Sequence, residues 1–269
     1  MNKLSLFLPA ALAAYSFRWS WWSKNKKGLN VLVYHKIGYH PRGSKLKELW
    51  VTPERFEKHI IWLVKNGYNP IGFSELLDCY KNNKPVDKLV LITFDDGYEN
   101  NYKYAYPILK KYNAKGNIFI VYNTIGKVNI WHKPEKEVWV NMATKEMLLE
   151  MDRSGVIEFG SHTMNHPRLA EISHEDAKWE ITESKKQLEN LFQKEMFAFA
   201  YPYGSGAYNK DVRKLVLDAG HIFDFSFKQG KTQWPWKRDD MPIDRLFIKN
   251  TDTCFDLGLH LKKGIAKFF

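Results

Sequence analysis

Leu89-Val-Leu-Ile-Thr-Phe-Asp-Asp-Gly97 is a nearly continuous apolar run that stops at two carboxylates and a glycine. An apolar run of this length without polar alternation predicts a strand that is buried on both faces. Such strands are typical of parallel sheets covered by helices. We therefore expect an α/β protein in which polar side chains gather where the strands end.

Short β-branched runs alternate with amphipathic helical patterns on both sides of this strand. Thr52 with Pro53 predicts one helix start, and Ser173 predicts another. The expected strands are 31–34, 69–71, 89–94, 117–121, 156–159, 197–200, 222–225 and 245–248. The expected helices are 52–67, 74–80, 98–112 with a bend or restart at Pro107, 144–155, one from 173 onward, 209–220 and 254–266. This order predicts a distorted (β/α) barrel of seven or eight short parallel strands, with an open doubly wound sheet as the alternative.

The chain has 269 residues, of which 44% are hydrophobic, so it can form one sizeable core. We expect a single catalytic domain over residues 31–269. Residues 1–30 differ in composition, because an apolar run from Leu4 to Phe17 is followed by Trp19, Trp21, Trp22 and several lysines. This segment is either a secretory signal or a piece that lies at a membrane interface.

Five of the eleven net positive charges lie in the first thirty residues, so the remaining 239 residues carry only +6. This weak charge, without a zinc-finger or RNA-binding motif, gives no support to a nucleic-acid partner. A glycan or an anionic membrane surface fits better. The only cysteines, Cys79 and Cys254, indicate neither a disulfide framework nor a thiolate metal site.

Four polar segments come directly after expected strands, and parallel strand ends share one face of such a fold. These segments contain His35, Asp95-Asp96, His162 with His166, and Tyr201-Pro-Tyr-Gly204. Either a helical turn or a compact loop can aim both imidazoles at one ion, and one of the two aspartates completes a three-ligand site. The other carboxylate is then free to take a proton from activated water.

The motifs Thr93-Phe94-Asp95-Asp96-Gly97, His162-Thr163-x-x-His166 and Tyr201-Pro202-Tyr203-Gly204 resemble three defining motifs of the NodB-type polysaccharide deacetylases, carbohydrate esterase family four. The resemblance covers roughly residues 31 to 250 in the same order. It implies a distorted (β/α) barrel that hydrolyses N-acetyl groups of amino sugars with a divalent metal, usually zinc.

By position, the resemblance implies that Asp95 is the general base and that Asp96, His162 and His166 hold the metal. It also implies that the Pro202-Tyr203 turn binds substrate, with the backbone N–H of Tyr203 at the oxyanion. For the general acid we favour His35, because one permuted branch of the family takes this group from an N-terminal strand that ends in Tyr-His. His260 in Leu257-Gly-Leu-His260 is the other candidate.

Two features depart from the family pattern. Ala200 stands where an arginine often precedes the third motif, and the family's Asp/Trp motif is not recognisable after Ile222. Arg245 either takes the place of the missing arginine or forms an ordinary structural ion pair. We leave it outside the catalytic group. Trp131, Trp139, Trp234 and Trp236 either stack on sugar rings or fill the core.

The leading hypothesis is therefore a metal-dependent deacetylase that acts on an N-acetylated glycan or a lipid-linked amino sugar in the cell envelope. It would be secreted, periplasmic or attached to the membrane by its N-terminus. One alternative is a catalytically impaired glycan-binding or membrane-attached assembly protein. Another is a non-haem iron enzyme, since two histidines and one carboxylate also bind that metal.

Overall fold

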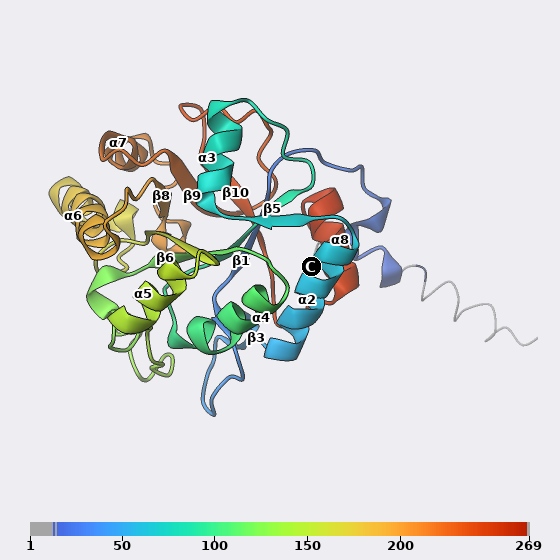
Figure 1. Ribbon diagram of the computed structural model, residues 1–269, viewed down its shortest axis with the longest axis horizontal. Coiled ribbons are helices and arrows are strands. Elements are labelled where there is room, and N and C mark those ends of the chain that lie inside the picture. The colour runs from blue at the N-terminus through green and yellow to red at the C-terminus, as the bar shows by residue number, and fades with distance from the viewer. Residues whose placement is uncertain (1–12, 14, 268–269) are drawn as a thin grey trace, which may run out of the picture.

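Seven parallel strands close into a barrel in the computed structural model, which describes residue 13 and residues 15–267 (Figure 1). Strand β1 pairs with β10 on one side and with β5 on the other, which closes the ring. In ring order the strands are β1 (Asn30–Tyr34), β10 (Ile243–Phe247), β9 (Phe223–Gln229), β8 (Ala198–Ala200), β7 (Ile157–Ser161), β6 (Gly116–Ile120) and β5 (Leu89–Phe94). An eighth strand, β4 (Asn69–Ile71), pairs with the first half of β5. The expected barrel is confirmed, and the open sheet is wrong.

The helices surround the strands (Figure 1). They are α2 (Pro53–Lys65), α3 (Phe73–Lys81), α4 (Tyr106–Lys111), α5 (Lys145–Arg153), α6 (His174–Phe192), α7 (Lys210–Asp218) and α8 (Cys254–Lys263). Side chains of Thr52, Thr144, Ser173 and Asn209 accept backbone N–H groups at four helix starts, as their residue types predict.

Alternate residues of β5 face two different parts of the core. Ile92 and Phe94 pack with residues of α2 such as Phe56, in the layer between barrel and helices. Leu91 packs with Phe119 and Phe225 of other strands. Both faces of β5 are thus buried, which explains why its sequence shows no polar alternation.

The segment expected as a helix over 98–112 contains a π-helical stretch, Asn101–Ala105, directly before α4. Pro107 has no N–H to donate, and the wider turn lies immediately before it. The side-chain amide of Asn101 donates to the backbone oxygen of His35 at 3.0 Å. The irregular turn therefore fixes the end of β1. Two short strands that the sequence did not indicate, β2 (Lys36–Ile37) and β3 (Trp50–Val51), form a separate pair beside it.

The two tryptophans after β9 pack in or against the core. Trp236 is buried with its ring 5.7 Å from that of Phe223, and Trp234 packs beside Tyr80 while its indole N–H donates to the oxygen of Lys84. The core interpretation is confirmed for Trp236, whereas Trp234 is only partly buried and packs against the edge of this core.

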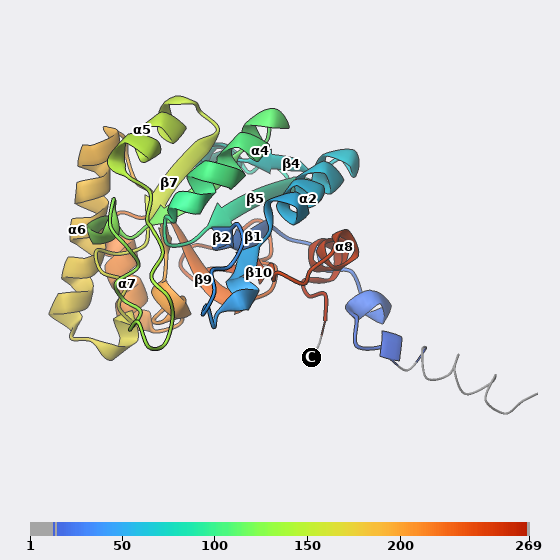
Figure 2. The same ribbon diagram turned by 90° about the horizontal axis from the view of Figure 1, so that it is seen from below.

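The described part of the N-terminal segment packs along α8 and the residues after it (Figure 2). The backbone N–H of Ser20 donates to Ala266 and that of Lys26 donates to Lys262, while the indole of Trp19 donates to Asp256 at 2.9 Å. Most of the apolar run from Leu4 lies outside the described residues. Among the residues the structure places, no helix is both long and apolar enough to cross a membrane. The domain boundary after residue 30 stays a prediction.

Candidate metal and catalytic site

The barrel brings the four polar segments to the same rim. His35 follows β1, Asp95 and Asp96 follow β5, His162 follows β7, and the turn Tyr201–Gly204 follows β8. Because β1 pairs with β5, His35 lies next to the two aspartates although sixty residues separate them in sequence. All the residues expected at the site are therefore assembled at one end of the barrel.

Asp96, His162 and His166 form a compact group with metal-ligand geometry. Their ligand atoms all lie within 4.8 Å of one another, and all three residues are buried. The Nε2 atoms of His162 and His166 lie 3.4 and 3.2 Å from Oδ1 of Asp96. Two imidazoles and one carboxylate are a donor set that zinc and similar divalent ions accept.

The hydrogen bonds around this group leave a place for a cation. Nδ1 of His162 lies 2.7 Å from the backbone oxygen of Ala200, which can only accept, so Nδ1 carries the proton. The lone pair of Nε2 then faces the Asp96 carboxylate. Burial lowers the pKa of His166 to about 4, against the opposing effect of Asp96, so this ring is neutral near pH 7. Two imidazole nitrogens that face one buried carboxylate oxygen leave a place where a cation can bind between them.

The loop that carries the two histidines is compact and not helical. Thr163 and His166 have φ of +70° and +62°, which ends any helical path. Glu180 of α6 is buried and accepts the backbone N–H groups of Met164 and Asn165 at 2.8 and 2.9 Å. Of the two conformations that the spacing allowed, the loop is the one observed, and α6 holds it in place.

Asp95 is held by Arg245 on β10. The guanidinium donates to both carboxylate oxygens at 2.6 and 2.7 Å, and its Nε donates to the oxygen of Ser226. Burial by itself would raise the pKa of Asp95, but the charge and hydrogen bonds of Arg245, together with the charges of His162 and His35, lower it below its ordinary value. Asp95 is therefore ionised at neutral pH and fixed in orientation.

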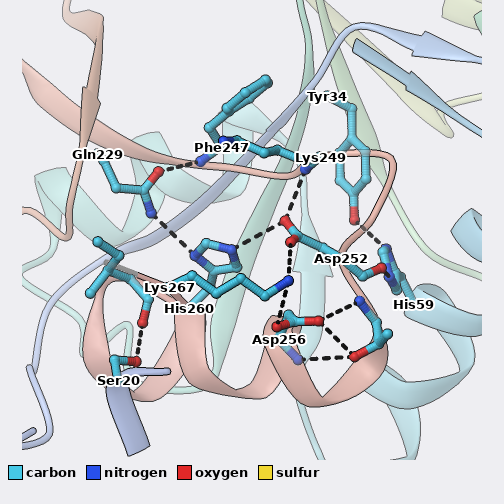
Figure 3. A network of polar contacts seen from close by, with 12 residues as sticks. Ser20, Tyr34, His59, Gln229, Phe247, Lys249, Asp252, Asp256, His260 and Lys267 are labelled. Carbon is cyan, nitrogen blue, oxygen red and sulfur yellow. Dashed lines mark hydrogen bonds and ion pairs between the residues drawn. The ribbon is translucent and has the colours of Figure 1, made fainter. Parts of the chain in front are cut away.

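His35 lies against two aromatic rings at the edge of the site. Its ring centroid is 5.7 Å from that of Phe227 and 6.0 Å from that of Phe247, both edge-on. Burial lowers its pKa, although Asp95 and Asp96 act in the opposite direction. His260 instead lies in α8, where it contacts Asp252 and Gln229 (Figure 3). The structure thus places His35, and not His260, beside the aspartates.

The opposite side of the metal group is covered by aromatic rings. Trp131 stacks on His166 with centroids 4.5 Å apart, and Tyr203 meets the same imidazole edge-on at 4.5 Å. Tyr203 has φ of +57° and is 41% exposed, while Pro202 is buried. Trp139 is exposed, with its indole N–H bound to the oxygen of His132. Trp131 therefore holds the orientation of the His166 ring, whereas Tyr203 and Trp139 are open to solvent.

The sequence does not assign a role at this site to three residues that the structure places there. Arg245 is a candidate substitute in the sequence, but nothing local links it to Asp95, which lies 150 positions away. Glu180 carried no motif signal. Lys36, next to His35 in sequence, is buried with its Nζ 4.6 Å from the centre of the Tyr98 ring, and burial lowers its pKa while Asp96 opposes this shift.

Comparison with known proteins shows similarity over most of the chain. The family model described as polysaccharide deacetylase matches residues 82–223. The chain is 36% identical to YxkH of Bacillus subtilis over 212 residues, which cover 78% of this chain and 68% of that protein. It is 30% identical to the poly-beta-1,6-N-acetyl-D-glucosamine N-deacetylase of Staphylococcus aureus over 230 residues, or 82% of this chain and 74% of that one.

Solved structures resemble the barrel closely. The polysaccharide deacetylase BC0361 from Bacillus cereus aligns with a TM-score of 0.73 at 27% identity, covering 88% of this chain and 69% of the other. The Streptococcus pyogenes deacetylase PplD, solved in complex with acetate, aligns with a TM-score of 0.72 at 25% identity. The alignment covers 86% of this chain and 96% of PplD.

Proposed function

Because the chain belongs to the polysaccharide deacetylase family, we propose that it removes N-acetyl groups from a polymeric amino sugar, with Asp95 as the base and His35 as the acid. It is a hydrolase of the N-deacetylase class. One observation carries the residue assignment. The buried group of Asp96, His162 and His166 lies beside Asp95, which Arg245 holds in place, and His35 follows the neighbouring strand.

Asp96, His162 and His166 would hold a divalent metal, with zinc as the first choice for this donor set. The fit rests on the two imidazole nitrogens that face Asp96 and on its Oδ1, which is buried and has no hydrogen-bond partner among the described residues. When bound, such a metal lowers the pKa of water and polarises a carbonyl group.

Asp95 is suited to take a proton from the attacking water. Arg245 keeps its carboxylate ionised, and the bidentate contact stops the side chain from turning to the metal group. Two adjacent aspartates thus receive different roles from their surroundings, Asp96 as a ligand and Asp95 as a base.

His35 is placed to return a proton to the nitrogen of the departing amine. Its ring is confined by Phe227 and Phe247, so the imidazole keeps one orientation. On the other side of the site, the Pro202-Tyr203 turn would bind the substrate, and the backbone N–H of Tyr203 would stabilise the oxyanion. Acetate and a free amino sugar are the products.

The other functions lose support from particular contacts. The absence of the family arginine at Ala200 is the reason to expect an impaired, glycan-binding protein. Arg245 removes that reason, because it binds the proposed base Asp95 from another strand. A non-haem iron oxygenase has no use for the second, clamped aspartate. Hydrolysis accounts for both carboxylates.

The substrate we favour is a poly-N-acetylglucosamine type of glycan, since a relative that covers 82% of the chain carries the name of such an enzyme. A lipid-linked amino sugar is the second candidate. Either substrate would place the protein at the cell envelope, with residues 1–30 as its secretory or membrane-interface segment.

The test is release of acetate from β-1,6-linked N-acetylglucosamine oligomers by protein that has been stripped with chelator and reloaded with zinc. We expect release that requires metal. Asp95→Asn should lose turnover and keep stoichiometric zinc, because the asparagine retains an acceptor for Arg245 but cannot take a proton. His162→Ala should lose the zinc. Full activity in either variant would overturn the assignment.

A further inference from the structure

A cavity of about 630 Å³ opens beside the catalytic rim, between the barrel, α8 and the N-terminal segment. Phe227 and Phe247 of the barrel line one side of it, Trp19 lines another, and the loop after β10 contributes Lys249 and Thr251. None of these groups belongs to the metal site. The cavity therefore lies outside the proposed metal site, and the proposed reaction assigns it no role.

The cavity shares two of its lining residues with the surroundings of His35. Phe227 and Phe247, which line it, are the two rings that meet the His35 imidazole edge-on. A polymer that presents one acetamide group between Asp95 and His35 can thus extend over these rings into the cavity.

The walls of the cavity are held in position by buried polar contacts. Figure 3 shows His260 between Gln229 and Asp252, with Lys267 approaching both Asp252 and Asp256. The indole N–H of Trp19 donates to Asp256, and the backbone of Ser20 is bound to Ala266. These contacts fix the wall formed by Trp19 without closing the cavity.

The chemistry of the lining suits a sugar ring. Aromatic faces pack against the apolar face of a pyranose, and the amphipathic indole of Trp19 is of this kind. Among the charged groups of the lining, Arg18, Lys249 and Lys267 are cationic and Asp252 is the one carboxylate. Asp252 already contacts Lys267 and His260. Asp256, just outside the lining, contacts Lys267 as well, so three cationic groups and two carboxylates surround the cavity and leave a small excess of positive charge, which disfavours an ammonium group.

We propose that this cavity is a subsite for a neighbouring N-acetylated unit of the substrate chain and that it rejects a unit that has already been deacetylated. An acetylated unit is neutral, whereas its deacetylated product carries an amine that takes up a proton. The proposal rests on the proposed function for the identity of the polymer. It adds that the enzyme reads the acetylation state of a unit next to the one on which it acts.

Binding is tested apart from turnover, by calorimetry on the full chain carrying Asp95→Asn. The ligands are a fully acetylated pentamer of β-1,6-linked N-acetylglucosamine and the corresponding dimer. Two further pentamers carry a single glucosamine, one at the first end and one at the other. We expect the pentamer to bind more tightly than the dimer, and the pentamer with glucosamine at the end that enters the cavity to bind more weakly. Adding Trp19→Ala should weaken binding of the acetylated pentamer by about tenfold and leave the dimer unchanged.

Each variant has a matched control. Trp21→Ala removes an exposed tryptophan of the same segment whose indole N–H is bound to Ser16, outside the cavity. Lys249→Glu should reduce the discrimination against glucosamine. Lys262→Glu makes the same charge change on an exposed position of α8 outside the lining and should leave that discrimination intact.

Equal effects of Trp19→Ala and Trp21→Ala, or equal binding of the pentamer and the dimer, would overturn the subsite. If the Lys249→Glu and Lys262→Glu proteins discriminate equally between the acetylated pentamer and the glucosamine-containing pentamer, selection by the charge of the cavity is overturned. A wild-type protein that releases no acetate but binds the pentamer in a Trp19-dependent way would instead refute the proposed function and leave the subsite standing.

Discussion

Arg245 donates to both carboxylate oxygens of Asp95, at 2.6 and 2.7 Å, from a strand 150 residues further along the chain. Both side chains are almost fully buried. A buried bidentate pair of this kind fixes geometry and protonation state together. Arg245 therefore orients Asp95 and keeps it ionised, which Ala200, at the position where the family often has an arginine, cannot do.

Arg245→Lys should raise the pKa of Asp95, because a lysine keeps the charge but loses the two-pronged contact. As pH falls, Asp95 is then protonated earlier, so the acidic limb of the kcat/KM profile should move to higher pH. Initial rates measured from pH 4 to 9 check this. An unchanged acidic limb would show that Asp95 is not the base.

A matched control is Arg213→Lys, which alters a second buried bidentate pair, between Arg213 and Asp224. Removing one partner of such a pair destabilises a protein by about 3 to 5 kcal/mol, and a lysine should cost less than that. We expect a lower melting temperature in both variants but a displaced acidic limb only in Arg245→Lys.

Glu180→Gln should weaken metal binding without removing a ligand. The carboxylate of Glu180 holds the backbone of Met164 and Asn165 between His162 and His166, the proposed metal ligands, and a neutral amide accepts those hydrogen bonds less well. Changes in groups that orient ligands reduce metal affinity by about 10- to 100-fold. Competition with a chromogenic chelator measures this, with Glu183→Gln on the same helix as the control. Unaltered affinity would show that the loop keeps its shape without Glu180.

His35→Asn should lower kcat by about 10²- to 10⁴-fold while zinc stays bound, because only proton donation is removed. As the proposed acid, His35 must be protonated in the active form of the wild-type protein. Since burial lowers its pKa, kcat/KM should fall as pH rises through a value below the ordinary one for histidine. The variant should lose this basic limb, and a limb that persists would assign the acid to another group.

His59 should make the protein less stable in mild acid. It is fully buried between Tyr34 and the backbone oxygen of Asp252, and burial lowers its pKa to about 4. As pH falls from about 6.5 to 4, the unfolded chain takes up a proton that the folded chain refuses. The free energy of unfolding should therefore decrease by about 3 kcal/mol over this window.

Urea denaturation at several pH values checks this stability prediction. His59→Gln should reduce the pH dependence, whereas substitution of the exposed His40 by glutamine should not. Equal pH dependence in both variants would contradict the assignment to His59.

From the sequence by itself we could predict a barrel, with an open sheet as the alternative, and the polar segments that meet at its rim. The apolar run into Asp95-Asp96-Gly97 indicated a doubly buried strand, and polar residues after β1, β5, β7 and β8 indicated a shared rim. These features depend on local patterns and on the rule that parallel strand ends coincide, so they can be read along the chain. The acid candidate His35 followed from the same rule combined with a family resemblance.

Only the tertiary structure decided which distant groups support the site. Arg245 reaches Asp95 because ring closure places β10 next to β1 and β1 next to β5, and no local pattern encodes that closure. Likewise, the packing of residues 15–20 against α8 creates the cavity beside Phe247. Contacts across such long sequence separations depend on the closure and packing of the whole fold, and a single sequence does not state them.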